Sequence, residues 1–233
     1  MSNKIFLIVF SFFHLTSFSQ KKLTVTSIFD KVEKYYVSKN NFCLSSKYTF
    51  FENKSINKIL DFYEGLIVKK GAISYQKVNN TEFVNFGDCS LMISKDNKVV
   101  NYANMASSAG QPIALKSFLK ILPLTKITDH NEYWVCELSS KGKIPLQFKK
   151  IIVYINKKNF SLSKQIFYSV GKQEIIKNNN KQTISNPRIE ILFFDKIFTS
   201  EMNLLIDKKN YFRKVNKKIN LVKRLQSYKL ITL

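Results

Sequence analysis

The side chains able to do chemistry are few and lie far apart in this sequence. His130 is the one histidine beyond the first nineteen residues, so a metal site with several histidine ligands is excluded. Cys136 follows six residues later, but His130 lies in a polar turn, Asp129 to Asn131, where a solvated histidine needs no other explanation. Covalent catalysis needs a base that a third group orients, and nothing near His130 supplies that group. We therefore predict no catalytic residue here.

The acidic residues form no recognisable catalytic pair either. Asp61 and Glu64 do not have a spacing suited to acid–base work, and Arg188 and Glu190 share one side of a strand, where they can pair across a surface. No glycine-rich phosphate loop and no nucleophile elbow is found in the sequence. The sequence thus predicts a non-enzymatic protein that uses no cofactor and no metal ion.

Three cysteines, Cys43, Cys89 and Cys136, lie in apolar segments typical of strands. In an oxidising compartment two of them can pair and leave one over, although the odd count and irregular spacing define no disulfide framework. The other interpretation is that all three are buried free thiols.

Helical periodicity is confined to two short segments. Apolar residues recur at helical spacing from Ile28 to Tyr36, which predicts a helix capped by Thr26 or Ser27 and ending near residues 38–41. Residues 113–122, between two prolines, predict a second, short helix.

The remaining chain alternates with the period of two that is typical of strands. A long polar run, residues 172–186, predicts an exposed hairpin loop, and the basic tail, residues 208–229, predicts one or two edge strands guarded by lysine. The expected fold is mainly β (α+β): a curved antiparallel sheet or unclosed β-barrel, with the N-terminal helix and the mid-chain helix packed on its concave face. The expected strands are residues 42–51, 60–69, 72–78, 82–86, 90–94, 98–104, 133–138, 148–155, 161–170 and 188–198.

The beginning of the chain has the pattern of a secretory signal peptide. Lys4 precedes an apolar run, residues 5–15, and Ser17 and Ser19 are the small residues that signal peptidase requires. A membrane-spanning helix needs roughly 20 apolar residues, about twice this run. We expect residues 1–19 to be cleaved and residues 20–233 to form a single soluble domain with a basic C-terminal segment, in the periplasm or secreted.

The charge of the chain, +22, suggests an anionic partner at first sight. However, only Arg188, Arg213 and Arg224 among its 38 basic residues are arginine, the residue that binds phosphate and guanine bidentately. Lysine spread evenly along the chain is typical of a solvated surface. We therefore predict that nucleic acid is not a partner, and that contact with a membrane is at most peripheral, through anionic headgroups.

Several segments resemble the outer-membrane lipoprotein carrier family, the LolA and LolB proteins. Residues 62–67 (FYEGLI) are similar to the family's aromatic-x-Gly-x strand, and residues 71–75 (GAISY) to the Gly-x-aromatic strand that follows it. Residues 91–102 resemble an apolar strand, a turn and a Tyr-bearing return strand, while 151–155 and 161–165 resemble the strands that close the family's sheet. Together these segments cover about two thirds of the chain after residue 19.

The resemblance implies an unclosed barrel whose concave face, lidded by helices, holds the acyl chains of a lipid or lipoprotein. The family's carriers hold the lid shut with an arginine inside the barrel, and this chain has no arginine before Arg188, so that mechanism is not carried over. By alternation along each strand, the residues expected to line the concave face are Tyr63, Ile67, Ile73, Tyr75, Leu91, Ile93, Tyr154, Ile166 and Tyr168.

Two functions are compatible with this sequence. One is a periplasmic protein that binds acyl chains, and the other is an envelope adaptor that docks a protein partner of a secretion or assembly complex without lipid cargo. The first needs an unfilled cavity of about 300 Å³ or more, whereas the second allows the same space to be filled by side chains.

Overall fold

The computed structural model describes residues 23–52, 58–104, 113–140, 147–177, 180–216 and 218–233. The expected signal peptide lies outside these residues. None of the helices in this part of the chain has the length and apolar character needed to span a bilayer.

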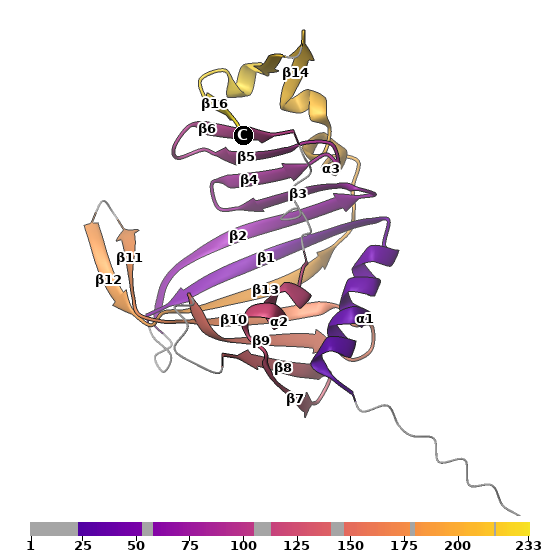
Figure 1. Ribbon diagram of the computed structural model, residues 1–233, viewed down its shortest axis with the longest axis vertical. Coiled ribbons are helices and arrows are strands. Elements are labelled where there is room, and N and C mark those ends of the chain that lie inside the picture. Colours follow the sequence, from indigo (N-terminus) through magenta and orange to yellow (C-terminus); the bar gives the residue numbers. More distant parts are fainter. Residues whose placement is uncertain (1–22, 53–57, 105–112, 141–146, 178–179, 217) are drawn as a thin grey trace, which may run out of the picture.

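Twelve strands of the described chain form one continuous sheet, in the order β16-β6-β5-β4-β3-β2-β1-β13-β10-β9-β8-β7 (Figure 1). Neighbouring strands are antiparallel except for β16, which pairs in parallel with β6. The edge strands β16 and β7 do not pair with each other, so the sheet is unclosed and the predicted fold class is confirmed. The strands are β1 (Asn41–Phe51), β2 (Ile59–Lys70), β3 (Ile73–Val78), β4 (Thr81–Asn85), β5 (Ser90–Ser94), β6 (Val99–Ala103), β7 (Leu124–His130), β8 (Tyr133–Ser139), β9 (Phe148–Asn156), β10 (Leu162–Ser169), β13 (Arg188–Lys196) and β16 (Lys229–Thr232).

The N-terminal helix α1 (Val25–Ser38) begins with a capping box. The hydroxyl of Thr24 accepts a hydrogen bond from the backbone N–H of Ser27 at 3.1 Å, and the backbone N–H of Thr24 donates to the Ser27 hydroxyl, also at 3.1 Å. These bonds satisfy backbone donors that have no partner within the helix. The cap is therefore Thr24, and the expectation of Thr26 or Ser27 was wrong because Ser27 is the other member of the box.

Helix α1 and the short helix α2 (Lys116–Ile121) cover one face of the sheet, over β1, β13, β10, β9 and β8. We call this side, which includes Leu44, Ile67 and Val153, the helix face. Lys116 links the two helices through ion pairs with Asp30 at 2.5 Å and Glu33 at 3.1 Å. The side chains beneath α1 are almost completely buried, so this half of the sheet has a filled core.

The C-terminal segment covers the opposite face, and it does so over β2 to β6. This segment, the C-terminal cover, contains α3 (Met202–Leu205), η2 (Lys208–Asn210), the hairpin β14 (Phe212–Val215) and β15 (Lys218–Leu221), and η3 (Lys223–Leu225). Its Tyr211, Phe212 and Leu225 pack on Val68 and Tyr75 of the sheet. We call this side the cover face. Figure 1 shows α1 near one end of the sheet and the cover at the other.

Strands β1 and β2 carry buried side chains of both the helix-face core and the core beneath the C-terminal cover. Cys43 and Val68 point to the cover face and are 1% and 0% exposed, while Leu44 and Ile67 point to the helix face and are 1% and 2% exposed. The apolar character of both sides of these strands thus follows from burial by two different elements.

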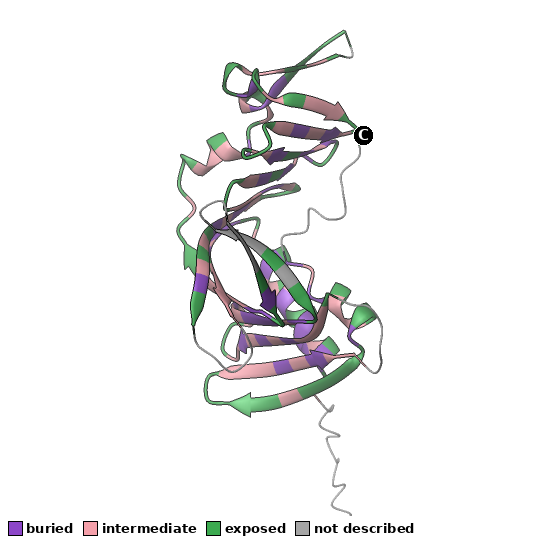
Figure 2. Cartoon of the chain, turned by 90° about the vertical axis from the view of Figure 1, so that its left-hand side faces the viewer, coloured by how far each residue is buried: buried purple, intermediate pink, exposed green. Residues whose placement is uncertain are grey.

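Three parts of the fold differ from the sequence expectations. Strand β7 was not predicted, because its side chains are exposed except for Ile127 and show no apolar alternation (Figure 2). The polar run at 172–186 is a hairpin as expected, but its arms are the strands β11 (Lys172–Lys177) and β12 (Asn180–Ser185). Within the basic tail, residues 208–229, the strands β14 and β15 form a hairpin separate from the main sheet, and the edge strand β16 begins only at its last residue, Lys229.

Candidate functional site

The pairing register decides on which face each of the nine predicted lining residues lies. Tyr63 and Ile67 lie on the helix face, because they pair with Tyr48 and Leu44 of β1. The others lie on the cover face: Ile73, Tyr75, Leu91, Ile93, Tyr154, Ile166 and Tyr168.

Four of those seven residues lie beneath the C-terminal cover. Tyr75, Leu91 and Ile93 are at most 3% exposed, and Ile73 packs against the same cluster. Burial is the main reason that the pKa of the Tyr75 hydroxyl is raised above its usual value. Within the described residues, this part of the cover face is filled by side chains of the protein itself.

The other three lie on the cover face beyond the reach of the cover. Ile166 is buried by its neighbours, whereas Tyr154 and Tyr168 are half-buried, with the ammonium groups of Lys164 and Lys150 over their rings at 5.7 and 5.4 Å. Apart from the buried Ile166 and Arg188, this part of the sheet is a partly solvated surface.

Ion pairs also form on the cover face of β10 and β13. Glu190 pairs with Lys164 at 2.6 Å and with Arg188 at 3.1 Å. The pair of Arg188 and Glu190 expected from the sequence forms, but Arg188 is buried rather than on the surface.

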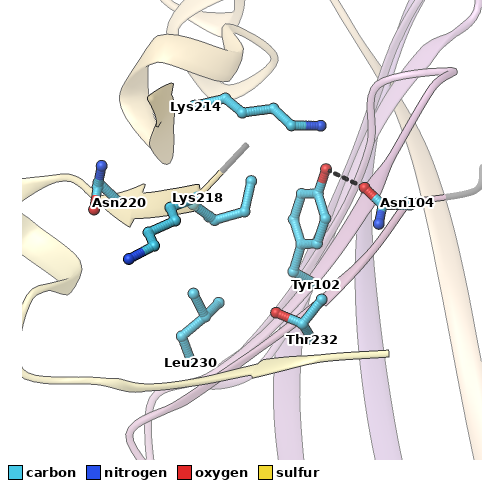
Figure 3. Close-up of a pocket in the computed structure, with 8 residues that line it drawn as sticks. Tyr102, Asn104, Lys214, Lys218, Asn220, Leu230 and Thr232 are labelled. Carbon is cyan, nitrogen blue, oxygen red and sulfur yellow. Dashed lines mark hydrogen bonds between the residues drawn. The ribbon is translucent and has the colours of Figure 1, made fainter. Parts of the chain in front are cut away.

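An open cavity of about 640 Å³ lies at the far end of the sheet, between the β14–β15 hairpin and the edge strand β16 with its neighbour β6 (Figure 3). The hairpin presents Lys214 and Lys218 across the space from Tyr102 and Leu230. The lining residues are Tyr102, Asn104, Lys214, Lys218, Ile219, Asn220, Leu230 and Thr232.

The packing of the cover holds the hairpin above the sheet edge. The ring of Phe212 meets that of Tyr102 edge to face, with their centroids 5.4 Å apart, and the Tyr211 hydroxyl donates to the backbone oxygen of Leu205 at 2.6 Å. The chain reverses at Asn216, whose φ of 48° is tolerated well by asparagine. The base of the hairpin is anchored while its outer part overhangs the sheet, which leaves the cavity.

The cavity combines an apolar wall with a cationic rim. The Tyr102 ring, Ile219 and Leu230 supply apolar surface, and the Tyr102 hydroxyl donates to the side-chain oxygen of Asn104 at 3.0 Å. The exposed side chains of Lys214 and Lys218 add two positive charges. This arrangement suits an amphiphile that has an apolar chain and an anionic group.

The cavity residues were not among the predicted lining residues, although Tyr102 is part of the segment that carried the family resemblance. Half of them come from the basic tail, where lysines obscure the alternation of Ile219 and Leu221 with polar neighbours. The alternation of apolar and polar residues within 218–221 was the one feature of the sequence that could have indicated a strand here, but it does not show which part of the sheet that strand faces.

The histidine and the cysteine singled out in the sequence are not brought together. His130 is exposed on edge strand β7 and points to the cover face, whereas Cys136 is fully buried on the helix face. In the described part of the chain, no three or more His, Cys, Asp or Glu side chains gather in an arrangement that could hold a metal ion.

All three cysteines are free and buried, with exposed fractions of 2% or less, and burial raises the pKa of the Cys136 thiol to about 12. We expect the native protein to react slowly with an aromatic disulfide reagent at pH 8, because the thiolate is the reactive form and none is accessible. In guanidinium without a reductant, three thiols per chain should react at once. Fewer than three would reveal a disulfide, and a fast reaction of the native protein would contradict this burial.

Comparison with known proteins gives likeness of fold only. No protein-family model matches the chain, and no curated protein is similar to it in sequence. Among solved structures, the LolA superfamily protein NE2245 from Nitrosomonas europaea is 14% identical, with a TM-score of 0.36 over 80% of this chain and 99% of that one. An uncharacterized conserved protein from Thermus thermophilus is 9% identical, with a TM-score of 0.47 over 89% of this chain and 98% of that one. MucB, solved in complex with MucA(peri), is 7% identical, with a TM-score of 0.34 over 86% of this chain and 62% of MucB.

The class that the fold defines is an open antiparallel sheet with a helix at its N-terminus. A LolA superfamily protein is among the solved structures similar to it.

Proposed function

We propose that this chain is a non-enzymatic envelope protein that binds the acyl chain of a lipid or lipoprotein, and that the site is the cavity beneath the β14–β15 hairpin. The observation that carries this proposal is an open space of about 640 Å³. Pockets for small ligands usually measure about 300–1,000 Å³. The filled cores under α1 and under the cover leave this cavity as the better candidate among those in the described residues.

The chemistry of the lining supports an amphiphile as the ligand. Methylene groups would contact Ile219 and Leu230, and an anionic headgroup or carboxylate would face the ammonium groups of Lys214 and Lys218. Lysine side chains also cover apolar surface with their stems while the charged end stays in water. The proposed location is the periplasm, because residues 1–19 have the pattern of a cleaved signal peptide.

The replacement Leu230→Asp tests the cavity. A charge on its apolar wall should lower the affinity for a fluorescent fatty acid about tenfold, the effect of losing roughly 1.4 kcal/mol of binding free energy. The matched control is Ile231→Asp, since Ile231 is the next residue of β16, is also half-buried, and points to the helix face. Fluorescence titration of the two variants and the parent, with thermal melts to check the fold, measures the difference.

Two outcomes of that experiment would contradict the proposal. Absence of fatty acid binding by the parent would end the acyl-binding hypothesis. An equal loss in both variants would show that the cavity is not the site.

An adaptor is the second candidate, and a specific surface favours it. Phe83 of β4 and Met92 of β5 lie directly opposite each other on the helix face, beyond the part that α1 covers. They are 42% and 37% exposed, and Ile231 lies further along the same face. An apolar cross-strand pair left open on a sheet suits contact with a protein partner, and this surface becomes the candidate site if the parent binds no fatty acid.

A further inference from the structure

A second hollow lies on the cover face between the C-terminal cover and the solvated surface of β9 and β10. It has a volume of about 410 Å³ and crosses strands β13, β1, β2 and β3. It is separate from the cavity beneath the hairpin, because the two share no lining residue. We call it the lysine groove, and it is lined by Ser45, Ser46, Lys47, Glu64, Gly65, Leu66, Lys77, Phe194 and Lys196.

The pairing register brings the groove residues together from distant parts of the sequence. Phe194, Ser45, Leu66 and Lys77 are successive neighbours across the four strands and lie in one row on the cover face. Lys196 lies beside Phe194 on the same strand. An apolar side chain thus alternates with a polar or charged one along the groove.

The charge of the groove is unbalanced. Among the described residues, Lys47, Lys77 and Lys196 form no ion pair, and Glu64 is the one carboxylate in the lining. The neighbouring surface differs, because Lys150 and Lys164 are each paired there with a glutamate. Three lysines against one glutamate leave a net charge of +2 around a hollow that is large enough for a ligand.

The apolar part of the groove is exposed as well. Phe194 is 51% exposed although it lies within a strand, and Leu66, on the other side of Ser45 in the same row, is half-buried. A bare anion makes no use of an exposed phenyl ring, whereas an amphiphile can place its apolar part against the ring and its anionic part among the lysines.

We propose that the lysine groove binds a phosphate-bearing amphiphile. Lys47, Lys77 and Lys196 hold the phosphate as point charges, and Phe194 and Leu66 contact the adjoining apolar part. The shared chemistry is a phosphate group, which a lipid headgroup or free phosphate can supply, and the exposed ring favours the lipid. This inference does not depend on acyl binding in the cavity.

The test is calorimetric titration of the full chain with dihexanoylphosphatidylglycerol, a water-soluble anionic lipid. The double variant Lys47→Gln/Lys196→Gln should bind it roughly tenfold more weakly, since two exposed ion contacts are lost. The matched control is Lys120→Gln/Lys126→Gln, which removes the same charge from exposed positions outside the groove. Its affinity should change less than twofold, and an equal loss in both double variants would overturn the proposal.

Two further arms separate the sources of the phosphate and the two sites. Phe194→Ser should weaken lipid binding severalfold and leave the response to inorganic phosphate unchanged. If this variant binds the lipid as tightly as the parent does, the groove is a site for a bare anion, and the proposal that it binds an amphiphile is overturned. The titrations are repeated with Leu230→Asp, in which the cavity wall is charged. If the lysine groove is the phospholipid site, Lys47→Gln/Lys196→Gln should lower the lipid affinity by the same factor when Leu230→Asp is also present. Failure of the cavity proposal and failure of the groove proposal are therefore distinguishable.

Discussion

Replacing Ile93 with aspartate is expected to unfold the protein at neutral pH. Ile93 is completely buried beneath the C-terminal cover, and its cross-strand neighbour on the same face is Glu82, which is 5% exposed. Lys95 already pairs with Glu82 at 2.9 Å, so the new carboxylate would meet a like charge. Burial of an unpaired charge costs several kcal/mol, in addition to about 2–5 kcal/mol for the lost packing. The total is comparable with the roughly 5–15 kcal/mol that stabilise a typical domain.

The matched control is Met92→Asp. Met92 precedes Ile93 on β5, points to the helix face and is 37% exposed, so a charge there can remain in water. Circular dichroism and urea unfolding should show a folded Met92→Asp variant with stability near that of the parent. If Ile93→Asp cannot be produced, Ile93→Ala gives a measurable loss of about 2–5 kcal/mol. Native stability in Ile93→Asp would mean that water reaches this site and that the core is open.

The replacement Phe29→Ala is expected to lower the free energy of unfolding by about 3–5 kcal/mol. Phe29 lies on α1 and is completely buried in the core of the helix face. The same helix is also held by a hydrogen bond in which the backbone N–H of Leu162 donates to the Tyr36 hydroxyl at 3.1 Å. Truncation of a buried phenyl ring removes its apolar contacts and leaves a cavity that the surrounding strands fill only in part. The midpoint of urea unfolding measures the loss.

Val37→Ala is the control for the same helix. Val37 is 71% exposed, and surface substitutions usually change stability by less than about 0.5 kcal/mol. Because β1 and β2 carry buried side chains of both cores, we expect Phe29→Ala to shift one cooperative transition. A separate early transition would show that the part covered by α1 unfolds independently.

The two buried cores also explain why the candidate ligand sites lie where they do. Each cover fills the space that it faces, under α1 on one side and under Tyr211 and Phe212 on the other. Open volume remains where the cover overhangs the sheet edge and where it ends, which are the cavity and the lysine groove.

Local pattern was sufficient to predict most of the secondary structure. Strands such as β5 (Ser90–Ser94) agree with the prediction residue for residue, because alternation along a strand directly reflects burial of one side. Strand β7 was not predicted because it lies at an exposed edge of the sheet, where its side chains are not selected for burial and show no apolar alternation. The cap of α1 was misplaced because Thr24, Thr26 and Ser27 are all capable of capping, and only the backbone geometry distinguishes them.

The nine predicted lining residues show the limit of that reasoning. Alternation correctly grouped Tyr75 with Ile73, and Ile93 with Leu91, within their own strands. It did not relate Ile67 on β2 to Tyr75 on β3, which point to opposite faces, because the register between two strands depends on the turn and bulges that join them.

The sequence by itself determined a mainly β chain with two short helices and with three cysteines in apolar segments typical of strands. Only the tertiary structure decided which face is covered at each end of the sheet. It therefore also decided that open space remains beside Leu230, in the cavity, and beside Phe194, in the lysine groove. The physical reason is that periodicity records whether a residue is buried, whereas the segment that buries it arrives from elsewhere in the chain. The C-terminal cover packs on strands more than a hundred residues earlier, and no local pattern encodes that contact.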